Sequence, residues 1–387
     1  MKLRTKFIIA FYLLLGVTIN ATAKTIKLSK QKGNSVEKLK AAYNNANAGD
    51  IILIDMNVTF NDSEKHFTIK KSGLTFKGAK NNKGVKYQLS RVSKKGNIIV
   101  LTVGHTNFEN LRFSTAVNLL RVEAKKQTLT NITIDNCEFL NSRYTGADFR
   151  GDFTDIRVTN CLFDDCKFGL QTMDSEILKN FIVKKSVFKR GDHQISIDNA
   201  FADTNKIEHE NILIDDCEFY VAARFNIALA NTRNTIISNN KRMDGGLQGY
   251  SQAIHIEHDT RDVLIKNNTM KNDIGNAIII FSTGYTGHGN GRKIPNEEKI
   301  DFGSSNITLD GNTITSSKKA AIMIGYGRGY LKILGNNSIN SEDKIIKAYE
   351  TKKTMEFHID DDVLMNGKKY STLKNSKEIE TYFFIKS

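Results

Sequence analysis

Three ionisable side chains, His255, Glu257 and His258, stand close together in the segment IHIEHD. Ile254 and Ile256 alternate with His255 and Glu257, so a strand here would bury its isoleucines and place the polar pair on its outer face. A histidine transfers protons near neutral pH, and a nearby carboxylate can orient it or exchange a proton itself. We therefore interpret this segment as the centre of a candidate catalytic site.

Small side chains occupy the corresponding positions in the preceding repeat of the chain. Ala228 aligns with His255, and Ala230 aligns with Glu257. One repeat earlier, Ser196 and Asp198 occupy these two positions. Alanine is disfavoured on the open face of a strand. Two alanines flanked by taller polar side chains therefore predict a notch in the sheet surface.

Basic residues precede these strands at similar offsets in successive repeats, and they would form a positive edge along the notch. Such an edge would suit an acidic polysaccharide. The alternative interpretation is that these side chains are simply solvated, as most surface Arg and Lys side chains are. The residues that we expect to contact substrate are Lys167, Arg190, His193, Arg150, Asn231 and, in a Gly-rich insertion, Arg292.

The leading hypothesis is β-elimination on an anionic, uronate-containing polysaccharide. This reaction needs a cation that neutralises the uronate carboxylate, a base that removes the C5 proton and an acid for the leaving oxygen. Arg224 or Arg190 would neutralise the carboxylate, and His255 or His258 would serve as the base. The sequence contains no metal-ligand motif, and it leaves a requirement for calcium open.

Two other functions stay open. Asp198 and Glu257 lie two repeats apart, so stacked strands would separate their backbones by ~9.6 Å. That separation is compatible with the ~6.5–9.5 Å between the two carboxylates of inverting glycoside hydrolases. The third possibility is a non-catalytic protein that binds glycans or has a structural role at a surface, because one fold hosts many functions.

One short phrase recurs eight times and defines the elements that would position these residues. Successive copies start 24, 25, 31, 23, 28, 44 and 25 residues apart, from Asn131 to Leu331. Apolar residues alternate within each copy, and a repeat of this length indicates one coil per repeat in a parallel β-helix. The seventh residue of each copy should stack in the interior; these residues are Cys137, Cys161, Ser186, Cys217, Asn240, Asn268, Asn312 and Asn337.

The cysteines allow two interpretations. Four cysteines in an exported protein could form disulfides. Three of them occupy the inward position where other copies carry Asn or Ser, so we favour stacked free thiols in the core.

The first 23 residues have the pattern of a cleavable export signal. Lys2, Arg4 and Lys6 precede an apolar run of about 13 residues, which is shorter than the ~20 that a membrane-spanning helix needs. Small residues at 21–23 form a cleavage site. We expect a mature chain that begins at Lys24, is exported to the periplasm or the cell exterior, and is not stably inserted in a membrane.

The charge balance indicates an anionic partner. The net charge of +14 over 387 residues becomes +11 when the three signal cations are removed. Because we expect export, an acidic polysaccharide is favoured and nucleic acid is not. We expect the protein to be a monomer.

Residues 24–387 should form a single domain with distinct ends. Residues 35–47 predict an amphipathic helix that caps the open N-terminal end of the solenoid. A Gly-rich insertion at 282–304 should form a protruding loop. The repeat is lost in 350–387, which should cap the other end.

The opening of the chain resembles a known superfamily. The predicted helix, the turn Ala48-Gly49-Asp50 and the segment SGLTFKGA from Ser72 are similar to the start of pectate-lyase-like, right-handed parallel β-helix proteins. The resemblance implies a right-handed solenoid and activity as a polysaccharide lyase or glycoside hydrolase. The string KRGDHQ from Lys189 also resembles alginate lyases and chondroitinase B, but it stands at a different place in the repeat, so no catalytic residue is carried over.

Overall fold

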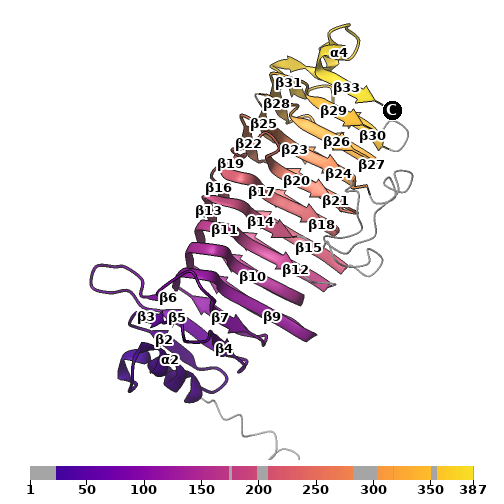
Figure 1. Cartoon of the computed structure of the whole chain (residues 1–387). Coiled ribbons are helices and arrows are strands. Elements are labelled where there is room, and N and C mark those ends of the chain that lie inside the picture. The colour runs from indigo at the N-terminus through magenta and orange to yellow at the C-terminus, as the bar shows by residue number, and fades with distance from the viewer. Residues whose placement is uncertain are drawn as a thin grey trace, which may run out of the picture.

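The structure, a computed structural model, describes residues 23–173, 177–197, 208–281, 303–316, 318–349 and 355–386. The chain winds into one elongated solenoid whose strands lie side by side along its length (Figure 1). Three strands form each coil, and equivalent strands of successive coils pair in parallel. The parallel β-helix predicted from the repeats is confirmed.

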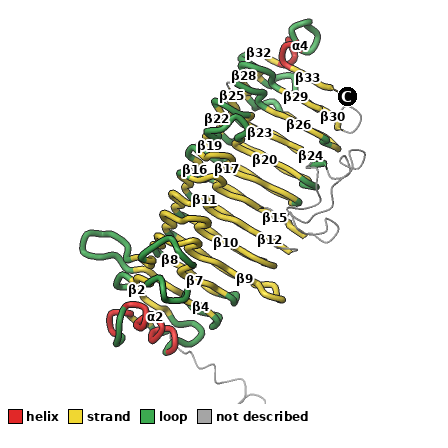
Figure 2. The backbone as a smooth tube through the Cα atoms, in the orientation of Figure 1, coloured by secondary structure: helices red, strands yellow, loops and turns green. Residues whose placement is uncertain are grey.

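The pairings between coils form three sets of parallel strands, which we call sheets I, II and III. Figure 2 shows strands of successive coils side by side along the solenoid. Sheet I contains β1 (Thr25–Lys27), β2 (Ile51–Ile54), β5 (Thr75–Gly78), β8 (Thr106–Glu109), β12 (Ile177–Lys184), β15 (Glu208–Asp215), β18 (Thr232–Ser238), β21 (Arg261–Lys266), β24 (Ser305–Asp310), β27 (Arg328–Ile333) and β30 (Met355–Ile359). Sheet II contains β3 (Val58–Phe60), β6 (Gln88–Arg91), β13 (Val187–Lys189), β16 (Glu218–Phe219), β19 (Arg242–Asp244), β22 (Thr269–Asn272), β25 (Thr313–Ser316), β28 (Ser338–Ser341) and β31 (Leu364–Met365). Sheet III contains β4 (Phe67–Ile69), β7 (Asn97–Leu101), β14 (Gly191–Ile197), β17 (Ala222–Ala230), β20 (Gln252–Glu257), β23 (Asn276–Phe281), β26 (Ile322–Gly325), β29 (Ile346–Tyr349) and β33 (Phe383–Lys386). Three long strands bend through the corners and belong to more than one sheet: β9 (Arg112–Asp135), β10 (Glu138–Thr159) and β11 (Leu162–Met173).

Left-handed residues lie near the start of the sheet I strands and directly after their end, and they explain part of the repeated phrase. Asn and Asp tolerate a positive φ better than other non-Gly residues. The first residue of the phrase has φ between 50° and 58° in Asn131, Asp155, Asn180, Asn211, Asn234, Asp262 and Asn306. The sixth residue is also left-handed in Asn136, Asn160, Asn239 and Asn267. These two positions set the corners of each coil.

The seventh residues of the phrase are buried and bonded along the solenoid axis. The backbone N–H of Asn240 donates to Oδ1 of Asn268 (3.0 Å), and that of Asn268 donates to Oδ1 of Asn312 (3.0 Å). The backbone N–H of Cys217 donates in the same way to Asn240 (2.9 Å). All four cysteines are buried and free, so the prediction of stacked thiols is confirmed.

The helix α2 (Ser35–Asn44) covers the N-terminal end of the solenoid (Figure 1). The Asn34 side chain accepts from two N–H groups of the first turn, and Glu37 accepts from the Asn34 N–H in return. The helix buries Val36, Leu39 and Ala42. It ends three residues before the predicted boundary, because the Asn-rich run at 44–47 favours a turn over further helix.

The solenoid includes both the start of the described chain and the C-terminal region that was predicted as a cap. At its start, β1 pairs with β2, so the first coil begins before Asp50. At its end, β30, β31 and β33 add a further coil, and α3 (Tyr370–Leu373), α4 (Ile379–Tyr382) and β32 (Lys368–Lys369) are inserted into it. The last coil has a neighbour on one side only, so its sequence does not need the Asn that links two coils.

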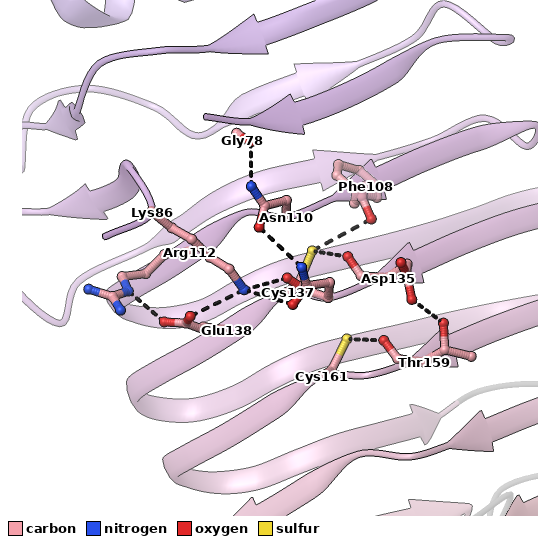
Figure 3. A network of polar contacts seen from close by, with 11 residues as sticks. Gly78, Lys86, Phe108, Asn110, Arg112, Asp135, Cys137, Glu138, Thr159 and Cys161 are labelled. Carbon is pink, nitrogen blue, oxygen red and sulfur yellow. Dashed lines mark hydrogen bonds and ion pairs between the residues drawn. The ribbon is translucent and has the colours of Figure 1, made fainter. Parts of the chain in front are cut away.

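A partly buried ion cluster holds the loop between β5 and β6 against the corner of sheets I and II (Figure 3). Glu138 accepts from Nε of Arg112 at 2.6 Å and lies 3.2 Å from Nζ of Lys86. Lys86 also donates to the carbonyl oxygen of Asn136 at 2.6 Å. Burial opposes ionisation of Glu138, but Arg112 and Lys86 outweigh it and lower the pKa of this carboxyl.

Candidate functional site

Sheet III places the predicted site residues in straight columns. His255 pairs with Ala228 in the preceding coil and with Ile279 in the following coil, and Glu257 pairs with Ala230. Toward the N-terminus, the column of His255 continues through Ser196, Gln171, Asp148 and Arg121. The register predicted from the sequence is therefore confirmed for the described coils.

The His255 ring is held between two acceptors. Its Nε2 lies 3.0 Å from Oε2 of Glu257, and its Nδ1 lies 3.0 Å from Oε1 of Gln252. The amide group of Gln252 donates to the carbonyl oxygen of Tyr250, which leaves Oε1 as the atom that faces the histidine. An imidazole protonated on both nitrogens satisfies both contacts. The arrangement therefore fixes the orientation of the His255 ring, with the Glu257 carboxylate within hydrogen-bond distance of Nε2.

His255 borders a hollow of about 360 Å³ on the surface of sheet III. The sequence predicted a notch above Ala228 and Ala230, but both alanines are buried, with 8% and 1% of their surface exposed. Phe225 lies in the same strand as Ala228, and His255 pairs with Ala228 from the next coil. The rings of Phe225 and His255 stack on each other. The hollow instead lies toward the C-terminal coils and is lined by Arg224, Phe225, Tyr250, Gln252, His255, Ile279, Phe281 and Met323.

Six aromatic rings follow one another along sheet III, in stacked, tilted or edge-on contacts, and include His255. Successive ring centroids are 4.3–5.1 Å apart, close to the ~4.8 Å spacing of stacked strands. The rings therefore form one continuous row across neighbouring coils, with apolar ring faces and edges as its surface. They belong to Tyr144, Phe168, His193, Phe225, His255 and Phe281.

Two cations flank this row of rings. Lys167 lies 5.8 Å from the ring centroid of Phe168, and the Arg224 guanidinium lies 4.7 Å from that of Phe225. Arg224 is half-buried and forms no ion pair with any residue that the structure describes, and its Nε has no hydrogen-bond partner there. A half-buried guanidinium without a carboxylate is a ready binding group for an external anion.

His193 lies within the row of rings and is only 8% exposed. Its ring stacks on Phe168 at 4.7 Å and meets Phe225 edge-on at 4.8 Å. Burial and the positive charges of Arg224 and Lys167 lower the pKa of His193 to about 3. His193 is therefore neutral above that pH, and its side chain is buried between Phe168 and Phe225 within the row of rings.

Two of the predicted substrate contacts lie apart from the hollow. Arg190 donates to Asp164 at 2.6 Å and lines a separate hollow with Lys189, Tyr220 and Arg242. Arg190 and Lys167 do not occupy equivalent positions in their coils. Phe168 pairs with His193, and Lys167 comes one residue before Phe168, whereas Arg190 comes three residues before His193.

Arg150 is engaged in an ion cluster four coils away from Glu257 in the same column. It lies 2.9 Å from the buried carboxylate of Asp148, which Arg121 also contacts at 3.0 Å. The sequence placed Arg150 correctly on the outer face, but the local pairing could not be predicted from one column alone.

Asn231 and His258 occupy the position that follows Ala230 and Glu257 in their respective coils. Both have left-handed backbones, with φ of 55° and 50°. Both are buried, with 4% and 2% of their surface exposed. His258 is close to His255 in the sequence, but its side chain is buried and does not line the hollow. His255 is the histidine that borders the hollow.

Two predicted site residues, Asp198 and Arg292, lie outside the described residues. The separation of Asp198 from Glu257 therefore stays a prediction, and so does the contact of Arg292 with substrate. Most of the predicted Gly-rich insertion at 282–304 is outside the described residues as well.

Sequence reasoning missed several residues that line the hollow. Tyr250 is 58% exposed there, and the cation of Arg224 lies 5.7 Å from its ring centroid. Gln252 positions His255, as described above. The available signal was the Gly-rich string GGLQGYSQ from Gly245, which marks an exposed loop directly before the strand that carries His255.

Within the described ranges, no three His, Cys, Asp or Glu side chains come together as a metal site. In the same part of the chain, no helix has the length and apolar character needed to span a bilayer.

Comparisons with known proteins identify the fold. A family model described as a right-handed beta helix region matches residues 72–241. The A-module of the mannuronan C-5 epimerase AlgE6 from Azotobacter vinelandii is similar, with a TM-score of 0.57 at 9% identity, over 88% of this chain and 98% of that module. The AlgE4 A-module from the same organism has a TM-score of 0.50 at 10% identity, over 86% and 95% of the two chains. A PL6 alginate lyase in complex with a trisaccharide has a TM-score of 0.45 at 13% identity, over 94% of this chain and 96% of that chain.

No curated protein sequence matches this chain. The resemblance to right-handed β-helix proteins is thus confirmed, and at these identities the likeness shows the fold alone.

Proposed function

We propose that this right-handed β-helix is a carbohydrate-active enzyme that cleaves a uronate-containing polysaccharide by β-elimination at the hollow of sheet III. The observation that carries the proposal is Arg224, a half-buried cation without an ion-pair partner in the described part of the chain. It stands beside a histidine–carboxylate pair on a row of aromatic rings. An acidic sugar would supply both the missing anion and a ring to lie against that row.

The chemistry assigns a role to each group. Arg224 would pair with the uronate carboxylate and so stabilise the negative charge that develops when C5 loses its proton. The C5–H electron pair would form the C4–C5 double bond as the C4–oxygen bond breaks. His255, protonated and held by Glu257, would give a proton to the departing oxygen. This differs from the sequence-based expectation that His255 is the base, because both of its nitrogens face acceptors.

The base for the C5 proton would come from the same hollow. Tyr250 is the further ionisable group among its lining residues and is exposed. We propose that Tyr250, acting as its phenolate, takes the C5 proton and becomes the neutral phenol, in place of His258, which is enclosed.

Two similar structures belong to mannuronan C-5 epimerases. Epimerisation at C5 and β-elimination both begin with removal of the C5 proton, so the same hollow could support either outcome. What differs is whether C5 is reprotonated or the C4–oxygen bond breaks.

The test follows both outcomes in one experiment. The protein is incubated with alginate, pectate and glycosaminoglycans in deuterated buffer, and ultraviolet absorbance, reducing ends and deuterium at C5 are measured. Elimination gives an absorbing unsaturated uronate, epimerisation gives deuterium without absorbance, and hydrolysis gives reducing ends alone. We expect absorbance, and we expect its rate to fall ~10²–10⁴-fold in His255→Ala.

Arg190→Ala is the matched control, because it removes an arginine that is paired with Asp164 away from the hollow. It should keep its rate, whereas Arg224→Ala should lose it. Absorbance that persists in Arg224→Ala and His255→Ala would refute this site. An absence of all three signals on every substrate would refute the enzyme hypothesis and favour a binding protein.

We also propose export, with residues 1–23 as the cleaved signal. This segment lies almost entirely outside the described residues, so the proposal relies on the sequence pattern. The mass of the protein recovered from a secreting host should correspond to a chain that begins at Lys24.

A further inference from the structure

Lys167 stands on sheet III two coils before Arg224, in a matching position. Lys167 directly precedes Phe168 in β11. Arg224 directly precedes Phe225 in β17. Phe168 pairs with His193 of the next coil, and His193 pairs with Phe225 of the coil after that. Two coils advance ~9.6 Å along the solenoid. The two cations are therefore separated mainly along the solenoid axis.

Lys167 has the features that make Arg224 a candidate anion-binding group. Its Nζ lies 5.8 Å from the ring centroid of Phe168, and its side chain is exposed. Within the described ranges, no carboxylate forms an ion pair with Lys167. By contrast, Arg150 on the same sheet lies 2.9 Å from Asp148. Lys167 is therefore available to an external anion.

The coil between the two cations carries a carboxylate at the matching position. Asp192 directly precedes His193, and its Oδ2 lies 3.5 Å from Nδ1 of that ring. The Asp192 side chain is 25% exposed. A sugar carboxylate at this coil would meet a like charge, whereas one at Lys167 or at Arg224 would meet an opposite charge. Sheet III therefore favours anionic groups at the two outer coils of the three.

Building on the function proposed above, we infer that the acidic glycan lies along the solenoid axis, with two of its carboxylates paired with Arg224 and Lys167. Two extended, 1,4-linked pyranose units cover a length similar to two coils, so the paired carboxylates belong to sugars two units apart. The row of aromatic rings runs in the same direction. Lys167 is thus a substrate-binding residue of a second subsite, away from the bond that is cleaved.

This spacing restricts the class of glycan. The requirement is met when every second unit presents a carboxylate to the sheet. A polymer in which uronates alternate with uncharged sugars meets it, and so does a ribbon-like uronate homopolymer whose successive units are turned over. In both cases the unit above Asp192 presents no carboxylate to it. A chain that crossed the sheet at a right angle would not reach Lys167 from Arg224.

Calorimetric titration with oligosaccharides of two lengths tests the inference. A disaccharide is too short to reach both cations, whereas a trisaccharide with a uronate at each end spans them. Wild type should bind the trisaccharide at least about fivefold more tightly, as expected for one further ion pair at an exposed lysine. Lys167→Ala should lose this gain and bind the disaccharide as wild type does. Lys167→Arg, which keeps the cation, should retain most of the gain.

The titrations use one series from a uronate homopolymer and one from an alternating polymer, and the series that shows the gain identifies the source of the substrate. Lys189→Ala is the matched control, because Lys189 also lies over an aromatic ring, 4.9 Å from the centroid of Tyr220, but belongs to sheet II. It should keep the gain. Circular dichroism checks that all variants are folded.

The outcomes separate this inference from the proposed function. Equal affinity of wild type for the two lengths in both series would overturn the inference and leave binding at Arg224 intact. A gain that persists in Lys167→Ala would do the same. If wild type binds neither length in either series, the proposed function fails, and the second subsite fails with it.

Discussion

At the scale of single residues, His193 shows how burial changes the meaning of a sequence position. The sequence predicts a substrate contact there, because a histidine stands at the edge of a strand near basic residues. The structure places its ring between Phe168 and Phe225, and burial together with nearby cations lowers its pKa to about 3. His193 is therefore a buried, neutral member of the row of aromatic rings on sheet III.

This assignment predicts a specific dependence of stability on pH. An unfolded histidine has a pKa near ~6.5, so between pH 6.5 and about 3 the unfolded chain binds a proton that folded His193 does not. Wild type should lose stability as the pH falls through this window. His193→Phe keeps a stacked ring and removes the titration. Its free energy of unfolding, measured with urea at pH 7 and pH 4, should therefore fall less than that of wild type. Equal losses in the two proteins would show that His193 is not buried as a neutral ring.

At the scale of elements, the interior Asn ladder joins one coil to the next. The amide group of Asn268 donates to the Ile237 carbonyl oxygen at 2.8 Å, while its Oδ1 accepts from the Asn240 N–H at 3.0 Å. The sequence predicted this stacking because the same position carries Cys, Asn or Ser in every copy of the phrase. It did not reveal the left-handed corners, although the Asn or Asp that begins most copies was the available signal.

Removing one amide from this ladder should be costly. Asn268→Ala leaves a buried N–H and a buried carbonyl without partners, and each orphan costs ~1–3 kcal/mol, so we expect a loss of about 2–6 kcal/mol. Asn268→Cys is the matched control, because Cys217 fills the equivalent position in another coil and bonds to a carbonyl. It should lose less. Chemical denaturation measures both, and an Asn268→Ala protein as stable as wild type would contradict the proposed role of the ladder.

At the scale of the whole molecule, the repeats predicted the coils and the columns of sheet III, because strand pairing transfers a sequence offset directly into space. The column from Arg121 to His255 follows this rule. What could not be predicted depends on contacts between columns, such as the pairing of Arg150 with Asp148. The position of the hollow depends on Tyr250, which a non-repeating loop contributes. The coil formed by β30, β31 and β33 was also not predicted, because the sequence there lacks the repeat.

The central claim is that Arg224 meets a uronate carboxylate in the hollow of sheet III. Calorimetric titration of a uronate oligosaccharide and of its carboxyl-reduced form into wild type and Arg224→Ala tests this claim directly. Reduction of the carboxylate should weaken binding to wild type about 10-fold or more, as expected for loss of a charge-assisted hydrogen bond. In Arg224→Ala, the two sugars should bind equally weakly, because the partner of the carboxylate is gone. An equal preference for the acidic sugar in both proteins would contradict the account.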